Sequence, residues 1–195
     1  MPAALIAGVL LLCAACAQTK QAALPPPPPD PATLMPALEQ RIAVLIEEER
    51  EKIDAHAKPL AIDPELTDIA RKRASDMAKK NYLAHAAPDG QTSASILMDT
   101  DARFQGLLGE NMAAQPYVKA IGVDVDKFAR AIVDQWLASP HHRDNLAFAD
   151  YNFTGVGAAV NGDTVYVTEL FSTDLGLGPH EASAPPVIGP KASGP

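Results

Sequence analysis

Residues 153–171 read FTGVGAAVNGDTVYVTELF, and their pattern predicts the central element of the fold. Its halves, Phe153–Val160 and Thr164–Phe171, are rich in Val, Thr, Tyr and Phe, and Asn161-Gly162-Asp163 between them is typical of a tight β-turn. In the second half both alternating faces are largely apolar, with Tyr166 and Leu170 on one side and Val165, Val167 and Phe171 on the other. A strand that is apolar on both faces lies in a covered sheet. The stretch therefore predicts a β-hairpin with helices above and below it.

The covering helices are predicted upstream of the hairpin. Residues 37–54 carry apolar side chains mostly three or four apart, as one face of a helix requires. A second helix begins at Asp63-Pro64, an N-cap followed by Pro at the first helical position, and runs to about Lys80. A third begins near Asp124 or Asp126 and ends before Pro140.

A short helix is expected at 93–100, whereas 101–122 is expected to be irregular because it contains three glycines. The order of elements predicts an α+β fold, a three-layer α-β-α sandwich around a small antiparallel sheet in a single domain.

Charged residues on these helices are expected to face water. The solvent-exposed face of the first helix is expected to comprise Glu47–Glu49, Arg50 and Lys52, with Glu48 and Lys52 as an i,i+4 ion pair. The basic cluster of the second helix is also expected to be a solvated face; it comprises Arg71, Lys72, Arg73, Lys79 and Lys80. The chain of 195 residues has 16 Lys and Arg against 24 Asp and Glu, a net charge of −8. This balance argues against nucleic-acid binding, which depends on neutralising phosphates.

The N-terminus is interpreted as an export signal. Residues 3–12 form an apolar run about half as long as a membrane span requires, which suits a signal peptide covering residues 1–15. The small pair Ala14-Ala15 before Cys16 resembles a bacterial lipobox, although Cys13 stands where Leu is usual and no Lys or Arg precedes the run. This resemblance implies that Cys16 becomes the first mature residue and carries lipid, such as palmitate. The alternative is an ordinary cleavage region, with a soluble secreted or periplasmic product.

Proline content divides the rest of the chain. Residues 17–36 contain Pro25–Pro29 and are expected to form an extended linker. The domain is predicted over residues 37–175, and the Pro- and Gly-rich residues 176–195 are predicted to be disordered. No cysteine follows Cys16, so the domain has neither an internal disulfide nor a thiolate metal site.

Few residues could carry chemistry. Of the five histidines, His56 lies in a polar helix end and His180 in the tail, which leaves His85 and the pair His141-His142. Glu110 lies between Gly109 and Asn111 in the Gly-rich stretch. The common metalloprotease, serine-hydrolase, P-loop and dinucleotide motifs are all missing from the sequence.

Four segments, in order over roughly residues 38–172, resemble the CAP superfamily (also called the SCP or SCP/TAPS domain) in its bacterial YkwD-like form. They are the helix over 66–80 leading into NYLAH at 81–85 and PDG at 88–90, then GEN at 109–111, WLASPHHRDN at 136–145, and FTGVG at 153–157 with its following strand. The resemblance implies an α-β-α sandwich with a cleft lined by two His and two acidic residues. In this chain His85 and His142 would be the His pair, able to bind a divalent metal, and Glu110 would be the first of the two acids. The position of the family's second acid is occupied by Ser139.

Two neutral imidazoles suit Zn²⁺, Cu²⁺ or Ni²⁺ better than Ca²⁺ or Mg²⁺, and Zn²⁺ is the metal we expect. Binding should be weak, because a catalytic zinc site has three protein ligands. Glu110 could instead accept a hydrogen bond from an imidazole and orient it. Glu169 is expected to reach solvent at a strand end, with a site role as the alternative.

Four further residues of these segments are interpreted as structural. Arg143, Asn145 and Asn111 are expected to tie loops together. Trp136 lies on the apolar stripe of its helix and is expected in the core.

These residues favour a non-catalytic module over an enzyme. The expected function is that of an exported, membrane-anchored CAP-domain protein of the bacterial cell envelope, binding a small molecule, lipid, protein or divalent metal in its cleft. One alternative is a protease-like secreted hydrolase with Ser139 as nucleophile, His142 as base and Glu110 as orienting acid. Another is a lipid- or sterol-binding module.

Overall fold

A computed structural model describes residues 26–173 of the chain. The predicted signal peptide, Cys16 and the C-terminal tail from residue 176 lie outside the described residues. The elements follow in the order η1 (Pro31–Leu34), α1 (Met35–Ile53), β1 (Ala61–Ile62), α2 (Pro64–Lys80), α3 (Ser93–Thr100), β2 (Leu108–Pro116), α4 (Val125–Ala138), α5 (Pro140–Ala147), β3 (Phe153–Asn161) and β4 (Thr164–Ser172). The first two begin inside the segment assigned to the linker.

The predicted hairpin forms the centre of the sheet. β3 and β4 pair antiparallel from Phe153↔Ser172 to Asn161↔Thr164, and Gly162 in the turn has a φ of 64°, which glycine adopts without strain. The full strand order is β1-β3-β4-β2, with β2 antiparallel to β4 and β1 parallel to β3. The sheet is therefore mixed, because the two-residue β1 adds a parallel edge.

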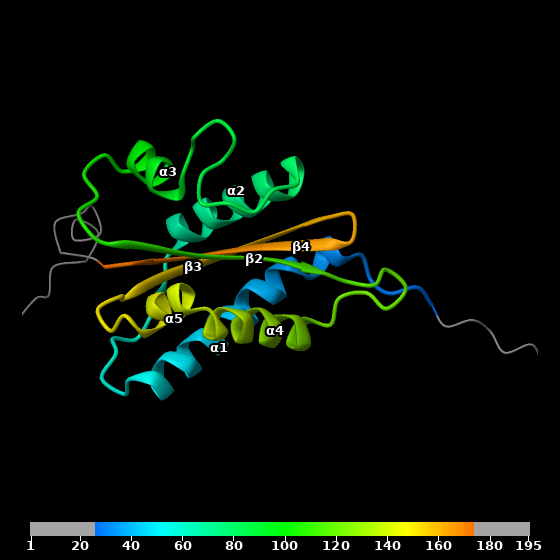
Figure 1. The fold of residues 1–195 in the computed structure, drawn as a ribbon, viewed down its shortest axis with the longest axis horizontal. Helices are drawn as coiled ribbons and strands as arrows, with labels where there is room; N and C mark the ends of the chain where they lie inside the picture. Colours follow the sequence, from blue (N-terminus) through cyan, green and yellow to red (C-terminus); the bar gives the residue numbers. More distant parts are fainter. Residues whose placement is uncertain (1–25, 174–195) are drawn as a thin grey trace, which may run out of the picture.

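Helices cover both faces of this sheet, as predicted. α1, α4 and α5 pack on one face around a core that includes Ile42, Ile132 and Trp136, whereas α2 and α3 pack on the other around Leu66, Ile69 and Leu97 (Figure 1). Each of these six side chains is nearly or fully buried. The expectation of a three-layer α-β-α sandwich is confirmed.

Two glycines of β3 let α2 approach the sheet. A Cβ atom on Gly155 would lie 2.2 Å from the backbone N of Thr67, and one on Gly157 would lie 2.1 Å from the backbone N of Arg71. Both distances are far below van der Waals contact, so larger residues would push α2 away. The FTGVG segment thus sets the distance between α2 and the sheet. The chain continues from α2 into the loop that carries His85.

Two elements differ from the sequence expectations. β2 lies inside the stretch expected to be irregular; its nine residues pair along their whole length with β4, and Trp136 Nε1 donates to the Met112 carbonyl at 3.0 Å. α5 was not predicted, because Pro140 was interpreted only as the end of α4. Pro140 also starts α5, since proline suits the first turn of a helix.

Two arginines expected on wet helix faces are buried. Arg50 is 1% exposed and donates to the carbonyls of Leu146 (2.8 Å), Phe148 (2.9 Å), Lys58 (3.1 Å) and Tyr151 (3.1 Å). Arg73 is also 1% exposed. Lys52 pairs with Glu49 at 3.0 Å and not with Glu48. The wet-face interpretation is wrong for both arginines, because each lies on the apolar side of its helix.

None of the helices described over residues 26–173 is long and apolar enough to cross a membrane.

Candidate functional site

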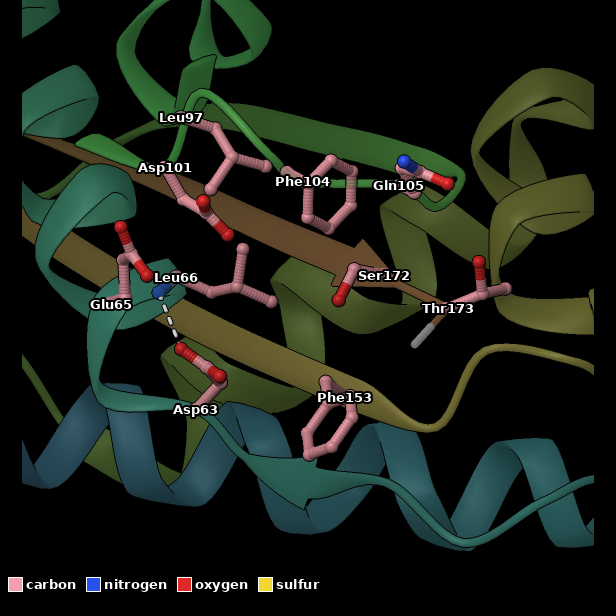
Figure 2. Close-up of a pocket in the computed structure, with 10 residues that line it drawn as sticks. All are labelled: Asp63, Glu65, Leu66, Leu97, Asp101, Phe104, Gln105, Phe153, Ser172 and Thr173. Carbon is pink, nitrogen blue, oxygen red and sulfur yellow. Dashed lines mark hydrogen bonds between the residues drawn. The ribbon is translucent and has the colours of Figure 1, made fainter. Parts of the chain in front are cut away.

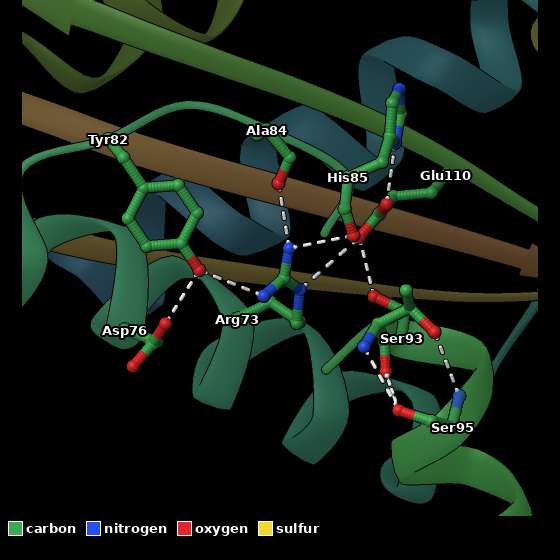
Figure 3. Close-up of polar contacts among 9 residues, drawn as sticks. Arg73, Asp76, Tyr82, Ala84, His85, Ser93, Ser95 and Glu110 are labelled. Carbon is green, nitrogen blue, oxygen red and sulfur yellow. Dashed lines mark hydrogen bonds and ion pairs between the residues drawn. The ribbon is translucent and has the colours of Figure 1, made fainter. Parts of the chain in front are cut away.

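Glu110 lies at the centre of a polar cluster between β2, α2 and α3. Its carboxylate accepts hydrogen bonds from His85 Nδ1 at 2.7 Å and from the Ser93 hydroxyl at 2.5 Å. Arg73 Nε lies 3.8 Å from Glu110 Oε1 and forms an ion pair with it (Figure 3). The Glu110 side chain is 11% exposed, whereas that of His85 is 64% exposed. Glu110, His85, Ser93 and Arg73, together called the His85 cluster, therefore place a largely buried carboxylate behind an imidazole that faces solvent.

Arg73 fixes the loop that carries His85. Its guanidinium donates to the carbonyls of Ala84 at 2.8 Å and His85 at 3.0 Å, and to the Tyr82 hydroxyl at 3.0 Å. Tyr82 in turn donates to Asp76 on α2 at 2.6 Å (Figure 3). Because Arg73 is buried and planar, these bonds hold the loop in one conformation beside Glu110.

Ser93 is positioned by the start of α3. Thr92 caps this helix by accepting from the Ser95 backbone at 3.1 Å, while the Ser95 hydroxyl accepts from the Thr92 backbone at 2.9 Å. This reciprocal capping box fixes the first turn. Ser93, which is 3% exposed, is thereby held toward Glu110.

His142 reaches the same region from α5. Asn111 of β2 donates to the His142 carbonyl at 3.2 Å, and Asn145 donates to the Glu110 carbonyl at 3.1 Å and to Asn111 Oδ1 at 2.8 Å. These bonds tie α5 to β2 and confirm that Asn111 and Asn145 are structural. Arg143 is exposed on α5.

The pKa of His142 is lowered, first by burial and then by the neighbouring charges of His85 and His141. Within the described residues His142 Nδ1 is buried and has no hydrogen-bond partner. Both features favour the neutral ring at neutral pH, which is the form that binds metals.

We expect His142 to titrate with a midpoint below the ordinary 6.5. His85→Gln should raise this midpoint, because it removes a neighbouring positive charge, but only in part, because burial remains. Imidazole NMR resonances followed against pH measure both values. His56→Gln, at an exposed position, is the matched control and should leave the midpoint unchanged. A His142 midpoint at or above 6.5 would contradict the arrangement.

The comparisons with known proteins agree with this architecture. The sequence pattern of the CAP family, described as the cysteine-rich secretory protein family, matches residues 46–173. The chain belongs to this family.

Bacterial proteins are among the relatives of this CAP-family chain. The chain is 29% identical over 126 residues to the uncharacterized protein YkwD of Bacillus subtilis, and the match covers 65% of this chain and 44% of that protein. The chain thus spans less than half of that relative. An extracellular protein with an SCP domain from Bacillus anthracis is 28% identical, with a TM-score of 0.57, and the match covers 77% of this chain and 45% of that one.

An outer surface protein of Borrelia burgdorferi shares the fold at 22% identity, with a TM-score of 0.58 over 71% of this chain and 93% of that one.

This CAP domain offers few side-chain atoms that could coordinate a metal ion at this site. Within residues 26–173, no three His, Cys, Asp or Glu side chains are grouped to hold one ion. His85 Nδ1 is engaged by Glu110, which leaves Nε2 as its donor, and His142 offers a second imidazole. A carboxylate that holds the other nitrogen of a ligating histidine is a common arrangement around protein metals. Only His85 is oriented in this way, and with the second imidazole of His142 the donor set has the chemistry that Zn²⁺ accepts but fewer protein ligands than a typical zinc site.

The catalytic arrangement proposed for a hydrolase is not assembled. Glu110 is hydrogen-bonded to His85, and the buried Nδ1 of His142 has no partner among the described residues. Ser139 is the residue between α4 and α5, where its backbone ends one helix and begins the next. Glu110 therefore does not orient His142 as the base of a Ser139 nucleophile.

Glu169 is fully buried, and the expectation that it reaches solvent is wrong. It lies in the middle of β4 on the face covered by α1, where the Thr154 hydroxyl donates to Oε1 at 3.2 Å. Burial raises its pKa well above the ordinary value, and the Thr154 bond and the charge of Arg50 oppose this only in part. Glu169 belongs to the interior and not to the His85 cluster.

A separate cavity of about 40 Å³ lies between α2, α3 and the ends of β3 and β4 (Figure 2). Its lining combines the carboxylates of Asp63, Glu65 and Asp101 with the rings of Phe104 and Phe153. It shares no residue with the His85 cluster.

Sequence reasoning missed Arg73 and Ser93 as parts of the site. Arg73 falls between Ala70 and Met77 on the buried stripe of α2, and a charged residue at such a position is a detectable signal. Ser93 carries no comparable signal, because its partner lies on another element.

Proposed function

We propose that this chain is an exported CAP-domain module of the bacterial cell envelope that holds a divalent transition metal, Zn²⁺ first, between His85 and His142. The observation that carries the proposal is the hydrogen bond from His85 Nδ1 to Glu110, which turns the free imidazole nitrogen outward. The neutral His142 ring supplies the second donor. No turnover is assigned to the site.

The chemistry of Glu110 supports this role. Arg73 and Ser93 hold its carboxylate from the inside, so that it faces His85. A fixed, hydrogen-bonded carboxylate keeps an imidazole in one tautomer and makes its free nitrogen a better donor. The bound ion would supply a positive charge with open coordination positions, to which an anionic group of a ligand could bind.

The sequence supports export and anchoring. The apolar residues 3–12 and the small residues before Cys16 resemble a lipoprotein signal. The match to an extracellular Bacillus anthracis protein agrees with a location outside the cytoplasm. Lipid on Cys16 would anchor the domain to a membrane.

Calorimetric titration of the full chain with Zn²⁺ tests the metal site. We expect weak binding of one ion, lost in the His85→Ala/His142→Ala variant and weakened about tenfold by Glu110→Gln, which disrupts the bond that orients His85. Ser139→Ala should bind as the wild type does.

The matched control is His141→Ala, because His141 is the exposed neighbour of His142 and offers the same donor without the contacts of the cluster. Circular dichroism establishes that each variant is folded. Loss of binding in His141→Ala, or full binding in the double variant, would refute the assignment. Cleavage of a peptide or ester that Ser139→Ala abolishes would favour the hydrolase instead.

A further inference from the structure

The loop between β2 and α4 presents two aliphatic side chains to solvent. Val118 is 60% exposed and Ile121 is 77% exposed, the largest exposed fraction among the large hydrophobic residues described. The backbone N–H groups of Ile121 and Gly122 both donate to the Val118 carbonyl at 2.9 Å, which closes a tight turn. Both side chains are therefore displayed at one loop tip.

This loop is held firmly at the end of the sheet. The Tyr117 backbone N–H donates to the Asp163 carbonyl at 2.8 Å, and its hydroxyl donates to the Gly162 carbonyl at 3.1 Å. Its ring also packs edge-on against Phe128 of α4, with centroids 6.4 Å apart. Val118 and Ile121 are thus carried on a fixed support, and their exposure is a property of the fold.

The N-terminal segment leaves the domain beside the same loop. Pro28 packs on Gly122 so closely that a Cβ atom there would lie 2.6 Å from the Pro28 Cβ, and the φ of +80° at Gly122 also favours glycine. In Figure 1 the start of the described chain, the β2–α4 loop and the β3–β4 turn lie at one end of the molecule. Pro28 is accordingly packed on the domain at this end.

Chain length limits how far this end can be from an anchor at Cys16. Pro26 is the tenth residue after Cys16, and a fully extended chain spans at most about 35 Å over that distance. Lipid on Cys16 would therefore keep the loop with Val118 and Ile121 close to the bilayer surface. Nearby charges are mixed, with Lys119 against Asp124 and Asp163, so apolar contact and not charge would govern the approach.

We propose that the loop of residues 117–122 rests on the lipid bilayer through Val118 and Ile121, with the His85 cluster directed away from the membrane. Glu110 lies six residues before Pro116 on β2, which places the cluster about 20 Å further along the strand. The inference rests on the anchoring at Cys16 in the proposed function. Two aliphatic side chains are too few to bind a membrane alone, but they suffice to orient an anchored domain.

Site-specific quenching in the full lipidated protein tests this orientation. Because no cysteine follows Cys16, Lys119→Cys and Gln105→Cys each place one environment-sensitive dye at an exposed position, one in the loop and one at the opposite end of β2. The protein is incorporated into phosphatidylcholine vesicles with brominated acyl chains. We expect at least twofold stronger quenching at position 119 than at 105, reduced to the level of 105 by Val118→Ser/Ile121→Ser.

Flotation of the vesicles distinguishes a failure of the anchoring from a failure of the orientation alone. The Cys16→Ala chain should remain in solution; if the wild-type chain does so too, the anchoring and the orientation are both overturned. A chain that floats with its vesicles but quenches equally at both positions overturns the orientation alone. Quenching at 119 that persists in the double serine variant would equally overturn the contact through Val118 and Ile121. Thermal unfolding verifies that the serine variant, altered only at exposed positions, is folded.

Discussion

Arg73→Met should lower the free energy of unfolding by about 3–5 kcal/mol, the usual cost of breaking a buried ion pair by removing one partner. Arg73 is 1% exposed, and its Nε lies 3.8 Å from the carboxylate of Glu110. Its loss would leave Glu110 without its buried cation and the Ala84 and His85 carbonyls without their donor. Urea denaturation followed by circular dichroism measures the change.

Lys72→Met is the matched control, because Lys72 is the exposed neighbour of Arg73 on the same helix. We expect it to change the free energy of unfolding by no more than about 0.5 kcal/mol. Adding Glu110→Gln to Arg73→Met should recover part of the loss, since a neutral amide in the cluster no longer needs a cation. Equal stability of the Arg73→Met and Lys72→Met chains would show that the buried pair contributes nothing.

The elements that the sequence predicted are those whose own residues carry the signal. The hairpin has β-branched and aromatic residues on either side of a turn tripeptide, and α1, α2 and α4 have apolar stripes. β2 could not be found in this way, because LGENMAAQP contains residues that are mostly depleted in strands. It is a strand because the free edge of β4 pairs with it and Trp136 binds its backbone. Tertiary contacts outweigh local propensity there.

The site shows the same division. His85, His142 and Glu110 were selected by their resemblance to a family pattern, whereas the partners of Glu110 follow from packing between α2, α3 and β2. The buried position of Arg73 on its helical stripe could have been noticed. The Ser93 contact and the tie from Asn145 to Glu110 could not, because each joins elements that are distant in sequence.

Glu169→Gln should stabilise the protein increasingly as pH rises above about 4.5, the ordinary pKa of its carboxyl. Burial raises the pKa of Glu169 in the folded chain, so above pH 4.5 the folded state binds more protons than the unfolded state. The contribution of this group to stability is therefore fully present below pH 4.5 and is lost as pH rises through the folded pKa. The advantage of the glutamine variant should grow by up to about 1.4 kcal/mol per pH unit in that window.

Urea denaturation of both chains at half-unit steps from about pH 4 to 8, which brackets the ordinary carboxyl pKa, measures this difference. Glutamine keeps the shape of the side chain and can accept the Thr154 hydrogen bond, so the comparison isolates the charge. Glu51→Gln, at an exposed position of α1, is the control and should track the wild type at every pH. A constant difference between the Glu169→Gln and wild-type chains would mean that the buried carboxyl ionises as it does in water. The positive charge of Arg50, which ties α1 to the end of α5, would then fully compensate the buried negative charge.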